Sequence, residues 1–170
     1  MKKIITLLAI IGMFSLQGCT VEEPMQDNDT IPEAFEIKVN LGRVTDKQYN
    51  IFSTFKFEIG GDLFNDETIL VYRKTGTISS GEPIWQLIPR TIYFDNGQEL
   101  DYDYDFSKVD FIITARGTYN LLETPNFIFN QTFRIVIIPS NLQTSINKSN
   151  YLEVMNALKI NENQIKKINL

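Results

Sequence analysis

The sequence predicts a mainly β domain, an antiparallel β-sandwich of about seven strands followed by short C-terminal helices. From Phe35 to Ile138 apolar and polar residues alternate, as they do along a strand with one buried face. Glycine and proline clusters divide this region into short runs, which is typical of antiparallel strands. After Asn150 the apolar spacing changes to the three and four residues of a helix. A small closed β-barrel fits the same pattern and is the alternative fold.

Residues 1–18 have the pattern of a bacterial lipoprotein signal peptide. Lys2 and Lys3 precede an apolar run, which ends near the tetrapeptide Leu16-Gln17-Gly18-Cys19. The run is about a dozen residues long, whereas a membrane-spanning helix needs roughly 20. The pattern predicts that the chain is cut before Cys19 and that this cysteine is lipidated. Two or three acyl chains would then hold the protein permanently on a membrane, which we expect to be the outer membrane.

Residues 19–33 comprise the lipidated cysteine and an acidic tether that contains two prolines. Such a segment buries too little apolar surface to fold by itself. Glu22 and Glu23 are similar to the acidic surface-export signals that follow lipoprotein cysteines in Bacteroidota, and an ordinary solvated linker is the equal alternative. Thr30, within Asp29-Thr30-Ile31, resembles an O-glycosylation site of that phylum and is a candidate for this modification. The folded domain is expected over residues 34–170.

Short alternating runs from Phe35 onward predict the strands. Each run is bounded by turn residues such as Gly60-Gly61 and Thr75-Gly76. The predicted strands occupy residues 35–41, 51–59, 69–74, 85–88 and 109–115.

Residues 91–106 predict a β-hairpin that turns at Asn96-Gly97. A two-residue loop would place Phe94 opposite Glu99, which mixes apolar and charged side chains on one face. A three-residue loop over residues 95–97, with Gly97 left-handed, places Ile92 opposite Leu100 instead. Because a shift of one residue moves every side chain to the other face, burial favours the three-residue loop.

The longest alternating run extends from Phe127 to Ile138 and ends at Pro139. Its last residues are apolar on both faces, which predicts a central strand covered on both sides. Beyond it, Asn150 and Asn161 are expected to cap two short helices, or one interrupted helix, within residues 150–168.

Composition excludes several classes of activity. The chain contains no histidine, and its one cysteine is Cys19. These counts exclude catalysis by Ser-His-Asp or Cys-His groups, disulfide chemistry, and metal sites built on histidine. The net charge is −5, and it becomes −7 when the two lysines of the signal are removed. An acidic chain without a nucleotide-phosphate motif indicates neither nucleic acid nor a dinucleotide cofactor as a partner. We therefore expect no cofactor and a non-enzymatic protein.

Two groups of residues are candidates for binding. Asp101, Asp103 and Asp105 have the spacing that opens a calcium-binding loop. Phe106 stands where such a loop needs glycine, and a straight strand cannot surround an ion, so a solvated strand face is the favoured interpretation and no metal site is assigned. Trp85, Tyr102 and Tyr104 would stack on sugars if exposed. Their phase matches the apolar residues, which favours buried or half-buried positions.

Several segments together resemble a group of small flavobacterial lipoproteins. These segments are the signal and tether, residues 99–106, residues 131–139 and residues 147–155. The resemblance implies an envelope location and no activity, and Cys19 is the one functional residue that it carries over. We expect a structural or interaction module with a protein or glycan partner. A surface-exposed glycan- or peptide-binding protein and a calcium-stabilised adhesion module are the alternatives, and the face of the outer membrane stays open.

Overall fold

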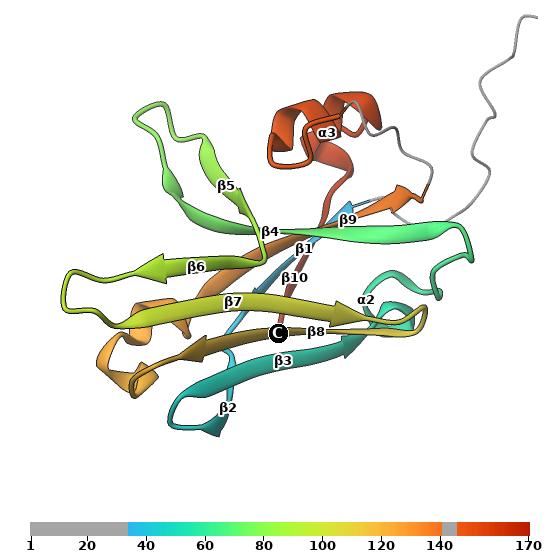
Figure 1. Cartoon of the computed structure of the whole chain (residues 1–170). Coiled ribbons are helices and arrows are strands. Elements are labelled where there is room, and N and C mark those ends of the chain that lie inside the picture. The colour runs from blue at the N-terminus through green and yellow to red at the C-terminus, as the bar shows by residue number, and fades with distance from the viewer. Residues whose placement is uncertain (1–33, 141–145) are drawn as a thin grey trace, which may run out of the picture. The chain divides into compact units, whose positions relative to one another are not determined.

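The computed structural model describes residues 34–140 and 146–170 (Figure 1). The predicted signal peptide and tether, including Cys19 and Thr30, lie outside these residues. The described chain belongs to one compact unit. Its strands form two five-stranded sheets that do not close into a barrel, which confirms the β-sandwich. The described residues contain ten strands where about seven are expected, and the additional ones include β2 and β10.

The first sheet has the order β10-β1-β9-β4-β5. All its neighbours are antiparallel except β1 and β10, which are parallel. Its strands are β1 (Ala34–Val39), β4 (Glu67–Thr77), β5 (Pro83–Leu87), β9 (Gln131–Pro139) and β10 (Lys166–Asn169).

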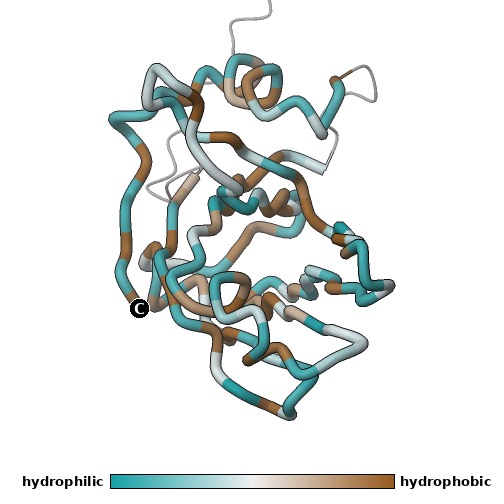
Figure 2. The backbone as a smooth tube through the Cα atoms, turned by 90° about the vertical axis from the view of Figure 1, so that its left-hand side faces the viewer, coloured by the Kyte–Doolittle hydropathy of each residue, from teal (hydrophilic) through white to brown (hydrophobic). Residues whose placement is uncertain are grey.

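The second sheet has the order β2-β3-β8-β7-β6 and is antiparallel throughout. Its strands are β2 (Gly42–Thr45), β3 (Gln48–Thr54), β6 (Arg90–Tyr93), β7 (Glu99–Phe106) and β8 (Asp110–Gly117). Two short 3-10 turns, η1 (Leu121–Glu123) and η2 (Pro125–Phe127), connect β8 to β9. Figure 2 shows apolar and polar residues interspersed along the backbone.

The main core lies between the sheets and is rich in aromatic rings. Phe55 and Phe111 approach to 5.3 Å between ring centroids, and Phe35 packs edge-on against Phe55 at 6.5 Å. A second core lies on the outer face of the first sheet, where α3 (Tyr151–Ala157) covers Tyr72 and Val136. Strand β9 is therefore buried on both faces, as its apolar ending predicts.

The hairpin of β6 and β7 has the predicted register. Ile92 lies opposite Leu100, the amide of Phe94 donates to the carbonyl of Gln98, and Gly97 is left-handed with φ +80°. Burial of Leu100 at the centre of the core explains this choice, because the alternative register would place a carboxylate there.

Two predicted strand segments have other structures. Residues 55–59 form a helix, α2 (Phe55–Ile59), because the Thr54 hydroxyl caps it and Gly60 ends it in a left-handed conformation. Phe55 and Ile59 are buried at helical spacing, while Phe57 is exposed. The run that starts at Phe127 becomes a strand only from Gln131, because η2 occupies its beginning.

The C-terminal helical segment is also shorter than expected. Asn161 does cap a turn, but η3 (Glu162–Gln164) is a single 3-10 turn and β10 follows it. In β10, Ile168 lies beside Ile37 of β1 and packs on the main core. Pairing with β10 satisfies backbone groups of β1 that would otherwise form an open sheet edge, which explains why a strand replaces the second helix.

Candidate functional site

A groove of about 780 Å³ lies between the N-terminal part of α3 and the arm formed by β5 and the turn before it. Its walls are mostly apolar. The residues that line it are Ile78, Glu82, Pro83, Ile84, Trp85, Asn147, Ser149, Asn150, Tyr151, Leu152 and Glu162. A mostly apolar concave surface with a few polar groups is typical of binding sites, so this groove is the candidate functional site.

Local sequence fixes α3 as one wall of the groove. The Asn150 side chain accepts a hydrogen bond from the amide of Glu153 at 3.3 Å, which confirms the predicted helix cap. Glu153 accepts from the amide of Asn147 at 3.1 Å and so holds the preceding loop. Tyr151 and Val154 are buried against the sheet, whereas Leu152, one of the groove residues, is 68% exposed. The helix thus leaves a large apolar side chain uncovered at the site.

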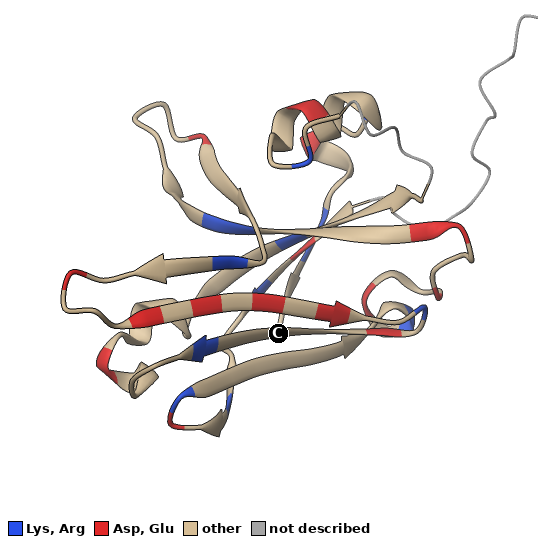
Figure 3. Cartoon of the chain, in the orientation of Figure 1, with Lys and Arg blue, Asp and Glu red and all other residues tan. Residues whose placement is uncertain are grey.

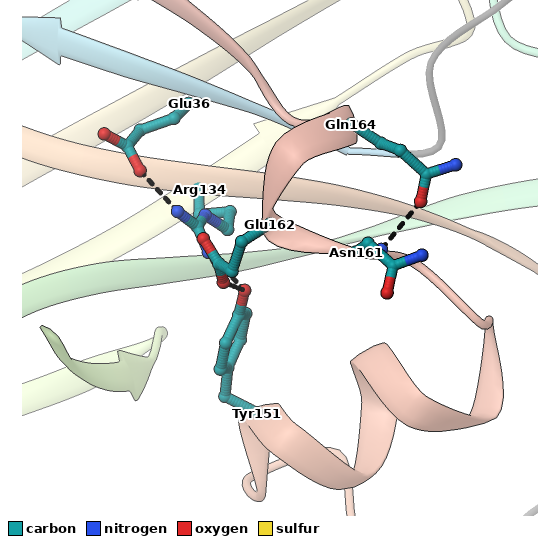
Figure 4. Close-up of polar contacts among 6 residues, drawn as sticks. All are labelled: Glu36, Arg134, Tyr151, Asn161, Glu162 and Gln164. Carbon is teal, nitrogen blue, oxygen red and sulfur yellow. Dashed lines mark hydrogen bonds and ion pairs between the residues drawn. The ribbon is translucent and has the colours of Figure 1, made fainter. Parts of the chain in front are cut away.

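Arg134 of β9 fixes the position of the groove's Tyr151 and Glu162 (Figure 4). Its guanidinium donates to Glu36 and to Glu162, each at 2.6 Å, and to the hydroxyl of Tyr151. The guanidinium also stacks on the ring of Trp85 at 4.2 Å from the ring centroid. Its side chain is 2% exposed, so these contacts compensate the charge where water does not reach it.

This network shifts the ionisation of its members. Burial lowers the pKa of Arg134, but hydrogen bonds to Glu162 and Glu36 outweigh it and hold that pKa above its ordinary value. Burial would raise the pKa of Glu162, yet donation from Arg134 and Tyr151 holds it below its ordinary value. Burial raises the pKa of Tyr151. The network therefore favours the charged forms of Arg134 and Glu162 and the neutral phenol of Tyr151.

Trp85 is the predicted stacking residue that lies at the groove. Its ring is half-buried, lies 5.6 Å from the ring of Tyr151 between centroids, and has one face occupied by Arg134. The indole nitrogen has no hydrogen-bond acceptor among the described residues. The aromatic pair contributes an apolar wall to the groove.

The groove adjoins an open sheet edge. Within the described chain, β5 is the last strand of its sheet and pairs with β4 alone. The amide of Ile88 donates to Val71 of β4. Because backbone groups alternate along an antiparallel strand, the groups of Leu87 and Trp85 point away from β4. They form an edge to which another strand can add.

The other two predicted stacking residues lie inside the sandwich. Tyr102 is 1% exposed, and its hydroxyl donates to the carbonyl of Phe127. Tyr104 is half-buried and donates to the carbonyl of Ile69 at 3.1 Å. The expectation that strand phase buries these rings is confirmed, and the structure does not bring them to Trp85.

The acidic residues of β7 alternate along the outer face of the second sheet (Figure 3). Asp101 accepts from the hydroxyl of Thr91 at 2.5 Å, and Asp103 accepts from the amide of Tyr104 at 2.8 Å. In residues 34–140 and 146–170 no group of three potential ligands could hold a metal ion. Asp103 and Asp105 are exposed on this face, and Asp101 is half-buried.

Sequence reasoning did not identify Arg134, although a signal was present. A single arginine interrupts the apolar run of β9, which is predicted to be covered on both faces, and such a residue needs partners. Glu36, Tyr151 and Glu162 come from distant parts of the chain, so the sequence did not reveal their convergence.

Comparisons with known proteins add no family to this description. No protein-family model, curated protein or solved structure matches the chain. In the described part of the chain, no helix has the length and apolar character needed to cross a membrane.

Proposed function

We propose that the chain is an outer-membrane lipoprotein whose β-sandwich domain is a non-enzymatic binding module for an extended segment of a partner protein. The observation that carries the binding proposal is the apolar groove beside the free edge of β5. An extended segment added to β5 would form backbone hydrogen bonds with that edge, and alternate side chains would enter the groove. The sequence pattern that ends at Cys19 supports the lipid anchor.

Charge favours a basic partner segment. Glu82 and Glu162 line the groove, and no lysine or arginine is among its described lining residues. The nearby Arg134 is already paired with two carboxylates. We therefore expect segments in which apolar residues alternate with lysine or arginine, because the carboxylates attract the basic side chains and the apolar walls bury the others.

Selection from a phage-displayed library of random decapeptides tests the groove. Leu152→Arg removes apolar surface and adds a repelling charge at an exposed groove position. Leu122→Arg is the matched control, because Leu122 is also exposed but does not line the groove. Enriched peptides should alternate apolar and basic residues and bind Leu152→Arg about tenfold more weakly, while the control binds as the unmodified chain does.

Binding is measured through Trp85, which is the one tryptophan of the chain and lies in the groove. Its emission should shift when an enriched peptide binds. Methylating every second backbone nitrogen of the peptide gives two variants, one for each set of alternate nitrogens. Only the variant that methylates the nitrogens facing β5 should bind more weakly, because those nitrogens donate hydrogen bonds to the β5 edge. Peptides that bind Leu152→Arg as tightly as the unmodified chain would refute the groove as the site.

Fractionation of cells tests the anchor. The unmodified chain should sediment with outer membranes, and Cys19→Ser should not, because no acyl chain can be attached. Protease added to intact cells then determines the face of the membrane, since only a surface-exposed domain is digested. Membrane association of Cys19→Ser equal to that of the unmodified chain would contradict lipidation at Cys19.

A further inference from the structure

A second cavity, of about 660 Å³, lies beside the end of the main core where β4, β5, β6 and η2 meet. It differs from the groove because its lining is polar and basic. The residues that line it are Lys38, Arg73, Lys74, Thr75, Gly76, Gln86, Ile92, Asn126, Phe127, Asn130 and Thr132. None of these is acidic, although aspartate and glutamate outnumber lysine and arginine in the chain. The cavity therefore concentrates positive charge in an acidic protein.

Arg73 is held rigidly in this cavity. Its guanidinium lies over the ring of Tyr102 at 4.5 Å and over the ring of Phe127 at 5.5 Å from the centroids. Its Nε donates to Oε1 of Gln131 at 2.9 Å. Gln131 is fixed in turn, because its amide nitrogen donates to the carbonyls of Asn126 and Phe129. An arginine positioned in this way needs little rearrangement to bind a ligand.

Arg73 has no anionic partner among the described residues. Its exposed fraction is 8%, and no carboxylate of residues 34–140 or 146–170 lies within 4.0 Å of it. Arg134, the other buried arginine, pairs with two carboxylates. Burial lowers the pKa of Arg73, yet an arginine stays protonated at neutral pH. A buried guanidinium without a counterion is costly, and an incoming anion would remove that cost.

We infer that this cavity binds a small acidic sugar, whose oxyanion, a carboxylate or a phosphate, is held by the Nη groups of Arg73. Planar guanidinium matches such oxyanions through paired hydrogen bonds, and Nε is already engaged by Gln131. Lys38 and Lys74 add positive charge at the cavity. Gln86, Asn126 and Thr132 offer amide and hydroxyl groups for sugar hydroxyls, and the volume accommodates a mono- or disaccharide.

Calorimetric titration of the full chain with glucuronate, glucose 6-phosphate and glucose tests this inference. At least one acidic sugar should bind about tenfold more tightly than glucose, because a charge-assisted pair with arginine replaces a neutral contact. Comparison of glucuronate with glucose 6-phosphate determines whether carboxylate or phosphate is preferred. Raising the salt concentration should weaken the preferred ligand, although less than it would weaken a surface ion pair.

Variants locate the binding. Arg73→Lys retains the charge without the planar fork and should weaken binding about tenfold, and Arg73→Gln should weaken it further. Arg116→Gln is the matched control on the outer face of the second sheet and should bind as the unmodified chain does. The double variant Lys38→Gln and Lys74→Gln leaves the Arg73 cluster in place, and we expect it to bind about threefold more weakly.

Circular dichroism identifies any variant that fails to fold. If the Arg73 variants do not fold, the double lysine variant tests the inference instead. Both of its lysines line the cavity and are exposed or partly exposed. Equal affinity for glucose and both acidic sugars would overturn the inference. So would acidic-sugar binding that is unchanged in folded Arg73→Gln, or unchanged in the double lysine variant. The test is independent of the groove, since Leu152→Arg should leave acidic-sugar binding intact.

Discussion

At the scale of single residues, Arg134 has the largest predicted effect on stability. Replacement by methionine preserves much of the side-chain volume but removes the charge that Glu36 and Glu162 share. Breaking a buried pair by removing one partner costs about 3 kcal/mol or more, and the stacking on Trp85 is also weakened. We expect Arg134→Met to lower the free energy of unfolding by about 3 kcal/mol in chemical denaturation.

Arg116→Met is the control for this substitution. Arg116 is exposed on β8, so its replacement should change the free energy of unfolding by less than about 0.5 kcal/mol. Equal effects of the two substitutions would show that the Arg134 network does not stabilise the fold.

Glu162 makes the free energy of unfolding depend on pH. Its pKa is held below the ordinary value in the folded chain, so its contribution is present above the pKa of the unfolded chain. The contribution is lost as pH falls through the folded-state pKa. Because most of the side chain is exposed, the loss is small. Glu162→Gln should therefore flatten the decline in unfolding free energy between about pH 5 and pH 3. An unchanged slope in that variant would contradict the role of Glu162.

Among single residues, the sequence predicts interactions between residues that are close along the chain. It does not predict interactions between residues that only the fold brings together. The cap at Asn150 needs only Glu153 three residues later, and the structure contains it. The partners of Arg134 are 98, 17 and 28 residues away, so no local pattern links them. The unpaired state of Arg73 is likewise defined by what the fold places around it.

At the scale of elements, the turn at Gly97 determines the register of β6 and β7. Gly97 has φ +80°, and a Cβ there would meet nothing within 4 Å, so substitution costs only backbone strain. Gly97→Ala should lower the free energy of unfolding by about 1 kcal/mol, and Gly97→Asn by less.

Gly76 provides the comparison for this turn. Its φ lies in the ordinary range, and a Cβ there would make normal contact with Ile84 at 3.9 Å. Gly76→Ala should leave stability unchanged or slightly raised, as judged by the denaturation midpoint. A destabilisation as large as that of Gly97→Ala would show that conformation at the turn is not the cause.

The elements predicted incorrectly differ from expectation for two physical reasons. Residues 55–59 alternate as a strand does, but Phe55 and Ile59 also have helical spacing, and the signals at Thr54 and Gly60 decide for α2. Near the C-terminus, the cap signal at Asn161 predicts a second short helix. The open edge of β1 provided a partner that favoured β10 instead, and sequence alone does not show which edges are open.

At the scale of the whole described unit, the two cores differ in the elements that close them. The main core is enclosed by both sheets, whereas the outer core is closed by one seven-residue helix and its flanking turns. A helix of this length is not stable alone, so α3 depends on Tyr151, Val154 and Met155 packing against the first sheet. We expect α3 to open locally, which would expose the outer core and remove one wall of the groove while the sandwich stays folded.

Hydrogen exchange should therefore show two stabilities. We expect the amides of α3 to exchange through local opening, about a hundredfold or more faster than those of β9, which global unfolding exposes. Arg134→Met should accelerate exchange in α3 far more than its effect on global stability accounts for, because it releases Tyr151 and Glu162 from the sheet. Exchange in β8, which lies in the other sheet, should follow global stability alone. Identical protection of α3 and β9 would mean that the two cores unfold as one, and then the groove would be a rigid surface that a partner meets already formed.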